Sequence, residues 1–93
     1  MQTNFLLGTL KMSRRARSAL QREPYDLIAR HAINEHGSVT HRERKRNEAA
    51  MTTLGELVSR YQVDPTNPGK GTILVKTSAC WKETTVCLET EVA

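Results

Sequence analysis

Residues 40–63, THRERKRNEAAMTTLGELVSRYQV, contain the point at which a helical pattern gives way to a strand pattern. Thr40 is followed three residues later by Glu43, and this capping box predicts a helix that begins at about His41. The first two turns of this helix carry no apolar residue, and an apolar face starts only at Ala49. We therefore expect the first half of the helix to be solvated or bound to an anionic partner.

Gly55 separates two patterns that can be interpreted in different ways. Leu57, Tyr61 and their neighbours recur at helical spacing, but they also occupy alternate positions of a strand. We prefer a strand from about Leu57 and a helix that ends at about Thr53, because a glycine near the end of a helix is well placed as its cap. Whether residues 55–62 form a strand or continue the helix stays open at this point.

Two further helices are predicted on the N-terminal side of this stretch. Ser13 can cap a first helix, and Pro24 stops that helix and suits the first turn of the next. Residues 25–36 form the clearest helical pattern in the chain, with Gly37 in the position of a left-handed C-cap. The apolar face of the first helix consists of Ala16, Ala19 and Leu20.

Runs of β-branched residues predict two strands near the C-terminus, over residues 72–77 and 84–90. The turn-rich segment 64–71 connects the first of them to the strand that follows Gly55. Three strands with short connections most simply form an antiparallel meander, which the helices cover on one face. Residues 4–10 predict a short strand or an extended N-terminal arm.

We therefore expect one α+β domain over residues 1–93, in which two or three N-terminal helices pack on a three-stranded antiparallel sheet. Residues 1–12 are an arm or a short strand, residues 13–54 a basic helical half, and residues 55–93 the half that forms the sheet. Only four aromatic residues are present, so we expect a core that is mostly aliphatic.

The charge of the chain is unevenly distributed. Of 14 basic and 10 acidic residues, ten basic and four acidic ones lie within residues 11–46, whereas residues 47–93 carry four basic and six acidic ones. Clustered arginines indicate an anionic partner, namely an acidic protein surface, a nucleoprotein complex or nucleic acid, and the alternative is a solvated charged face. The candidate partner-binding residues are Arg14, Arg15, Arg17, Arg42, Arg44, Lys45 and Arg46.

The composition indicates no membrane span and no signal peptide, and we expect a cytoplasmic protein without membrane partners. Cys80 and Cys87 are too few to form a disulfide framework of the secreted kind. Two reduced thiols are the favoured interpretation, and pairing across a hairpin is the alternative. The sequence does not indicate an oligomeric state.

No motif predicts a catalytic centre, a cofactor or a metal site. His31, His36 and His41 are five residues apart, whereas two metal ligands on one helix face are three or four apart. We therefore expect these histidines to lie at the surface or at helix caps.

Two further motifs are also weak. Residues 67–72 contain a Gly-Lys pair but lack the other residues of a phosphate loop, so we expect a turn there. A helix-turn-helix built around Gly37 would have to bury Glu43 and Arg46, which are charged. We therefore do not expect DNA to be read through this motif.

Five short segments, spread over nearly the whole chain, form a combined pattern. They are Leu7-Gly8; Leu27-Ile28-Ala29-Arg30-His31 followed by Gly37; Arg46-Asn47-Glu48-Ala49; Gly55-Glu56-Leu57-Val58-Ser59-Arg60-Tyr61; and Thr84-Thr85-Val86-Cys87-Leu88. In this order they resemble a loosely defined group of small proteins carried by bacterial plasmids, phages and integrated elements. That group usually has an acidic, tryptophan-containing turn where this chain has residues 34–37, which leaves the partner open.

The resemblance implies a setting among the accessory genes of mobile elements and no catalytic residue. Small proteins in that setting often antagonise host defence, as anti-CRISPR or antirestriction proteins do, by binding a surface. We therefore expect a non-enzymatic accessory protein that binds a protein or nucleoprotein surface, and its net positive charge argues against DNA mimicry.

Two alternatives stay open. The first is a ribonuclease toxin that resembles the RelE/ParE type, which the order of one strand, two helices and three strands suits. The usual basic and aromatic catalytic residues of that type are not evident on the last strands. The second alternative is a basic regulator that binds nucleic acid.

Overall fold

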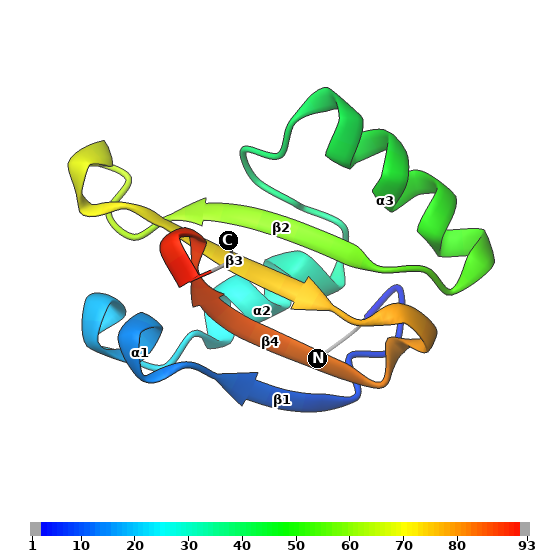
Figure 1. The fold of residues 1–93 in the computed structure, drawn as a ribbon, viewed down its shortest axis with the longest axis horizontal. Coiled ribbons are helices and arrows are strands. Elements are labelled where there is room, and N and C mark those ends of the chain that lie inside the picture. The colour runs from blue at the N-terminus through cyan, green and yellow to red at the C-terminus, as the bar shows by residue number, and fades with distance from the viewer. Residues whose placement is uncertain (1–2, 92–93) are drawn as a thin grey trace.

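The computed structural model describes residues 3–91, and within them four strands form one sheet in the order β1-β4-β3-β2 (Figure 1). The predicted α+β class is confirmed, with three helices between the first strand and the second. The elements are β1 (Thr9–Met12), α1 (Arg14–Leu20), α2 (Tyr25–Ala32), α3 (His41–Thr53), β2 (Leu57–Gln62), β3 (Thr72–Thr77) and β4 (Glu83–Leu88), with short 3₁₀ turns at Pro68–Lys70, Ala79–Trp81 and Glu89–Glu91.

The sheet is mixed, and the prediction of a three-stranded antiparallel sheet is incomplete. Strands β2, β3 and β4 form the expected antiparallel meander. The fourth strand, β1, runs parallel to β4 and pairs Thr9 with Glu83 and Met12 with Val86. This pair joins the two ends of the described chain, and an argument from short connections between neighbouring segments cannot find it.

The N-terminal segment is an arm that leads into a strand. Residues 4–8 lie outside β1, which begins later than the predicted strand over 4–10. Phe5 is nevertheless buried, at 4% exposure. Gly8 has φ +66°, and a Cβ at this position would lie 2.1 Å from the carbonyl oxygen of Lys82, so only glycine allows the close approach of the arm to the β3–β4 connection.

Helices α1 and α2 cover one face of the sheet, and α2 lies behind the strands in Figure 1. The side chains between these helices and the sheet are mostly aliphatic, as predicted, with one tyrosine among them. Ser13 caps α1 as predicted, by accepting a hydrogen bond from the backbone N–H of Ala16. The core residues on this face are Ala16, Leu20, Leu27, Ile28, Tyr61, Ile73, Val75 and Val86.

Helix α3 does not join the other two helices on that face, which corrects the prediction that one face of the sheet carries all of them. It lies beside β2, at the edge of the sheet (Figure 1). The side-chain amide of Asn47 donates to the carbonyl of Val58 at 2.8 Å and accepts from its N–H at 3.0 Å. These two bonds satisfy edge groups that would otherwise need another strand.

The loop that precedes α3 pairs with the same edge. The N–H of Arg60 donates to the carbonyl of His36 at 2.9 Å, and the N–H of Ser38 donates to the carbonyl of Arg60 at 2.9 Å. Gly37, between them, has φ +71° and lies so close to β2 that a Cβ would be 2.0 Å from the carbonyl oxygen of Arg60.

Several predicted helix and strand ends are corrected. Helix α2 ends at Ala32 and not at His36, so Gly37 is not its cap. Leu54, and not Gly55, is the left-handed C-cap of α3, with φ 56°. The predicted change from helix to strand in this region is confirmed, because α3 ends at Thr53 and β2 begins at Leu57.

The remaining C-terminal predictions are confirmed with a small correction. Strand β3 spans the predicted residues 72–77, whereas β4 ends at Leu88 and is followed by a 3₁₀ turn, two residues earlier than predicted. Cys80 and Cys87 carry free thiols, the first exposed and the second buried, so they do not pair across the hairpin.

Candidate functional site

The basic residues of α3 are exposed because the helix uses only one narrow stripe for packing. Glu43, Asn47 and Ala50 face the rest of the protein at helical spacing. The arginine and lysine side chains of the first two turns lie outside this stripe and are exposed. Within residues 3–91, no acidic side chain forms an ion pair with the set that we call the basic ridge: Arg42, Arg44, Lys45 and Arg46.

Glu43, the acid within this segment, is neutralised inside the protein. Its two carboxylate oxygens accept hydrogen bonds from Nε and Nη2 of Arg60 at 2.9–3.1 Å, and one oxygen also accepts from the N–H of Thr40 at 2.9 Å. The hydrogen bonds from Arg60 are the largest cause that lowers the pKa of Glu43 to about 2. The ridge therefore keeps its positive charge.

This contact also explains how the polar helix packs. The charges of Glu43 and Arg46 were the reason for not expecting a packed helix-turn-helix; Arg46 is exposed, whereas Glu43 is partly buried. In the structure the charge itself makes the contact, since Arg60 on β2 provides a two-pronged partner for the carboxylate.

The basic cluster on α1 lies elsewhere in the molecule. Figure 1 shows α1 at the end of the sheet farthest from α3, so the structure does not bring the two predicted clusters together. Arg17 forms an ion pair with Glu23. Arg14 and Arg15 are exposed; the hydrogen bond from Ser13 is the largest cause that lowers the pKa of Glu91, and the charge of Arg15 acts in the same direction. The α1 cluster is thus partly neutralised, whereas the ridge is not.

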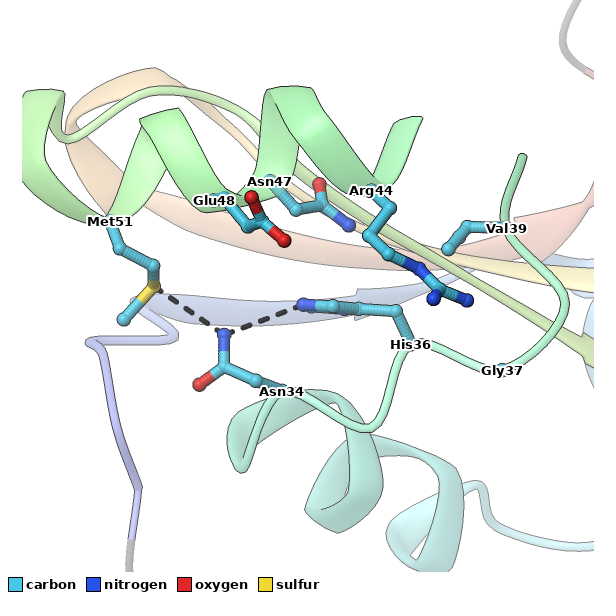
Figure 2. Close-up of a pocket in the computed structure, with 8 residues that line it drawn as sticks. All are labelled: Asn34, His36, Gly37, Val39, Arg44, Asn47, Glu48 and Met51. Carbon is cyan, nitrogen blue, oxygen red and sulfur yellow. Dashed lines mark hydrogen bonds between the residues drawn. The ribbon is translucent and has the colours of Figure 1, made fainter. Parts of the chain in front are cut away.

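A pocket of about 530 Å³ opens between α3 and the loop that joins it to α2 (Figure 2). We call it the histidine pocket, because the ring of His36 forms part of its wall. Arg44 of the basic ridge also lines it, so the pocket and the ridge share a residue. The lining residues are Asn34, His36, Gly37 and Val39 from the loop and Arg44, Asn47, Glu48 and Met51 from α3.

The pocket is connected to a chain of hydrogen bonds that runs through the core. Nδ1 of His36 lies 2.6 Å from Oγ of Ser59, which lies 2.5 Å from Nδ1 of His31. Nε2 of His31 lies 2.9 Å from Oγ1 of Thr77, which lies 2.7 Å from Oγ1 of Thr84. The last hydroxyl lies 2.7 Å from the carbonyl oxygen of Leu7. We call this series the core polar chain.

Both histidines of the chain are held in the neutral form. Burial, followed by the neighbouring His36, lowers the pKa of His31 from 6.5 to about 3, and burial also lowers the pKa of His36. His31 is fully buried, with 0% exposure, and the ring of Phe5 contacts it edge-on at 5.2 Å between centroids. A charged imidazole at this place would have no acidic partner among its hydrogen-bonded neighbours.

The donor and acceptor of each hydrogen bond in the core polar chain follow from the end of the chain at Leu7. The carbonyl of Leu7 can only accept, so Thr84 gives its single hydroxyl hydrogen to Leu7. Thr77 must then donate to Thr84, and its oxygen accepts from N–H at Nε2 of His31. Because neutral His31 carries one ring hydrogen, its Nδ1 is an acceptor.

The same reasoning assigns the donors and acceptors of Ser59 and His36 at the pocket. The hydroxyl of Ser59 donates to Nδ1 of His31, so the Ser59 oxygen accepts from N–H at Nδ1 of His36. Neutral His36 therefore keeps the lone pair of Nε2 as an acceptor at the pocket side. The amide of Asn34 approaches this nitrogen only at 3.4 Å (Figure 2). The pocket thus presents an acceptor with a fixed orientation, and the guanidinium of Arg44 lines the same pocket.

The prediction of surface or cap histidines is wrong for His31, and His36 is half-buried. A signal for this burial exists in the sequence. His31 stands four residues after Leu27 and three after Ile28, which places it on the apolar face of its helix. Its hydroxyl partners, Ser59 on β2 and Thr77 on β3, are far away in the sequence, and no spacing rule connects them to it.

The described part of the chain, residues 3–91, contains no group of three or more His, Cys, Asp or Glu residues that could hold a metal ion. In the same residues, no helix has the length and apolar character that crossing a membrane requires. Comparisons with known proteins found no match to this chain among family models, curated proteins or solved structures.

Proposed function

We propose that this protein is a non-enzymatic binding protein that docks onto nucleic acid, alone or within a nucleoprotein complex, through the basic ridge of α3. The observation that carries the proposal is the state of this ridge. Four exposed cationic side chains lie within residues 42–46 of one helix without ion-pair partners in residues 3–91, while the carboxylate of the adjacent Glu43 is bound by Arg60. Such clusters bind phosphates with little sequence selectivity.

The composition around the ridge favours a phosphate backbone over an acidic protein surface. Protein interfaces are usually centred on buried apolar or aromatic anchors, with charged residues at the rim. The first two turns of α3 provide no apolar anchor, because their outward residues are all polar or charged. Interfaces with nucleic acid are more polar and much more positively charged, as this helix is.

The cellular role that we propose for this binding is that of a mobile-element accessory protein. Such a protein can antagonise host defence by occupying a nucleoprotein complex, without cutting or modifying it. The support for this setting is the resemblance of the five short sequence segments to proteins of mobile elements.

The salt dependence of binding tests the ridge. Affinity for duplex DNA and for RNA is measured by fluorescence anisotropy at several salt concentrations. The slope of log K against log salt is about −0.9 for each phosphate that a basic group neutralises in duplex DNA. A variant that combines Arg42→Glu, Arg44→Glu, Lys45→Glu and Arg46→Glu should bind weakly and lose about three to four units of this slope.

A matched control changes the same number of charges elsewhere. Arg14→Glu, Arg15→Glu, Lys70→Glu and Lys82→Glu all alter exposed side chains outside α3. This control should keep most of the slope. Equal losses in the two variants would mean that binding reflects net charge alone, and unchanged binding by the ridge variant would refute the role of the ridge.

A ribonuclease is a second candidate, and one specific observation favours it. His36 presents a neutral, oriented Nε2 in the histidine pocket, which Arg44 also lines, and an imidazole base in one pocket with a phosphate-binding cation suits RNA cleavage. Incubation with labelled RNA decides between the two. Intact RNA after prolonged incubation supports a binding protein, whereas cleavage that His36→Phe abolishes supports the enzyme.

A further inference from the structure

We propose that the histidine pocket receives the ribose and phosphate of one RNA nucleotide, with the 2′-hydroxyl donating to Nε2 of His36 and the phosphate bound by the guanidinium of Arg44. This inference rests on the proposed function, since it names RNA as the polymer that the basic ridge holds. The pocket would distinguish RNA from DNA, which the ridge cannot do, because phosphates are common to both polymers.

The first argument is the chemistry of the His36 ring. The core polar chain places the ring hydrogen on Nδ1, where it is bound to Ser59, so Nε2 is an acceptor. Its present donor, the amide of Asn34, lies at the long distance of 3.4 Å. A ligand hydroxyl can make a shorter bond to this nitrogen, and the 2′-hydroxyl is the donor that RNA has and DNA lacks.

The second argument is the position of the charge. Figure 2 shows the Arg44 side chain extending from α3 toward His36, with its guanidinium near the backbone end of the ring, while Nε2 faces Asn34 at the other end; both residues line the pocket. Arg44 has no ion-pair partner in the described chain, although Glu48 lines the same pocket. A guanidinium and a hydrogen-bond acceptor that line one pocket at separate positions match a phosphate and a sugar hydroxyl of the same nucleotide.

The third argument is the size and the lining of the pocket. Its volume of about 530 Å³ lies within the range of small-ligand sites. The lining contains no aromatic side chain apart from the imidazole, so it offers no flat platform on which a base would stack. We therefore expect recognition of the sugar and phosphate without selectivity for the base.

The test compares three single-stranded oligonucleotides of the same sequence: RNA, DNA and 2′-O-methyl RNA. The wild-type protein should bind RNA about fivefold more tightly than DNA, which is the effect of one ordinary hydrogen bond. The 2′-O-methyl form lacks the donor and should bind like DNA. Equal binding of all three oligonucleotides would overturn the inference and leave the proposed function intact.

Variants separate the pocket from the ridge. His36→Phe removes the acceptor and should abolish the preference for RNA, while the salt dependence stays. His41→Phe is the matched control, since His41 is exposed on the first turn of α3 and does not line the pocket. A preference for RNA that survives in His36→Phe, or that His41→Phe also removes, would contradict the assignment. If neither polymer binds, the proposed function fails, and this inference fails with it.

Ser59 is a positioning residue in this scheme, and NMR can test it without any ligand. Long-range ¹H–¹⁵N spectra should show the ring hydrogen of His36 on Nδ1 and that of His31 on Nε2. In Ser59→Ala, His36 loses its fixed acceptor, and part of the population should carry the hydrogen on Nε2 with a matching loss of the preference for RNA. A wild-type His36 with its hydrogen on Nε2 would overturn the inference.

Discussion

Acidification between pH 8 and pH 5 should destabilise this protein mainly through His31. The folded state keeps His31 neutral down to a pKa of about 3, whereas in the unfolded chain its pKa returns to about 6.5. Below pH 6.5 the unfolded state therefore binds a proton that the folded state does not, and stability falls as the pH falls. The stabilising effect of the neutral ring is fully present above the unfolded pKa of His31 and decreases from there toward pH 3.

The magnitude follows from the size of the shift. One pKa unit corresponds to about 1.4 kcal/mol. At pH 5, about 1.5 pH units below the ordinary pKa of His31 and still well above its folded pKa, the loss in the free energy of unfolding is about 2 kcal/mol. His36 contributes with the same sign, because burial also lowers its pKa. For a domain of this size, such a loss is a large part of the total stability.

Between pH 8 and pH 5, the change in stability comes mainly from the histidines and not from the carboxyl groups. The carboxyl groups with lowered pKa have ordinary values of 3.8 to 4.5, so their contribution is lost mainly below pH 5. Urea unfolding at pH 8, 7, 6 and 5, followed by circular dichroism, gives the free energy of unfolding at each pH. His31→Gln keeps a donor and an acceptor at the same place without titrating and should remove most of the pH dependence, and His36→Gln should remove a smaller part.

What decides this prediction is the slope with pH, because any substitution of a buried residue lowers stability at every pH. A wild-type protein whose stability stays constant from pH 8 to pH 5 would refute the buried, neutral state of His31. So would an unchanged slope in His31→Gln, which would assign the titration to another group.

Three further predictions concern the contacts that hold α3 and its loop to the edge of the sheet. Asn47→Asp keeps the acceptor for the Val58 N–H but cannot donate to its carbonyl, so urea unfolding should show a loss of about 2 kcal/mol, while the exposed Glu48→Gln should show almost none. Gly37→Ala combines a positive φ with a clash against the Arg60 carbonyl, and thermal unfolding should show a loss of at least about 2 kcal/mol. Glu43→Gln should cost about 2 kcal/mol at pH 7 and little at pH 2, well below the ordinary pKa of 4.5, where most of the stabilisation by the carboxylate has already been lost. An equal cost at both pH values would contradict its ion pair with Arg60.

Much of the secondary structure could be predicted because local signals agree with the fold. The capping box of Thr40 and Glu43 marks the start of α3, and the β-branched run over residues 72–77 becomes β3 over the same residues. The prediction that Gly37 ends the helix over residues 25–36 was wrong, because a glycine with positive φ also occurs where two backbones approach closely. Sequence alone does not distinguish these two uses.

The candidate site was harder to predict, for a physical reason. The basic ridge is a local feature of one helix, so its residues could be named from the sequence. The hydrogen position of His36 in the histidine pocket depends on Ser59, Thr77 and Thr84, which the sheet register brings into one hydrogen-bonded chain with His31. Hydroxyl residues are common in strands, and nothing in their local sequence shows that two of them contact one buried imidazole and that a third continues the chain.

The core polar chain also connects the pocket to the N-terminal arm. A hydroxyl can donate in either direction, and a neutral imidazole can carry its hydrogen on either nitrogen, so the interior of the chain has no direction of its own. The direction comes from the carbonyl of Leu7, which only accepts and which Thr84 reaches from β4. The position of the arm therefore decides which nitrogen of His36 carries the hydrogen, although the arm does not line the pocket. If the arm were displaced, Thr84 would be free to donate back along the chain, and both forms of His36 would become accessible.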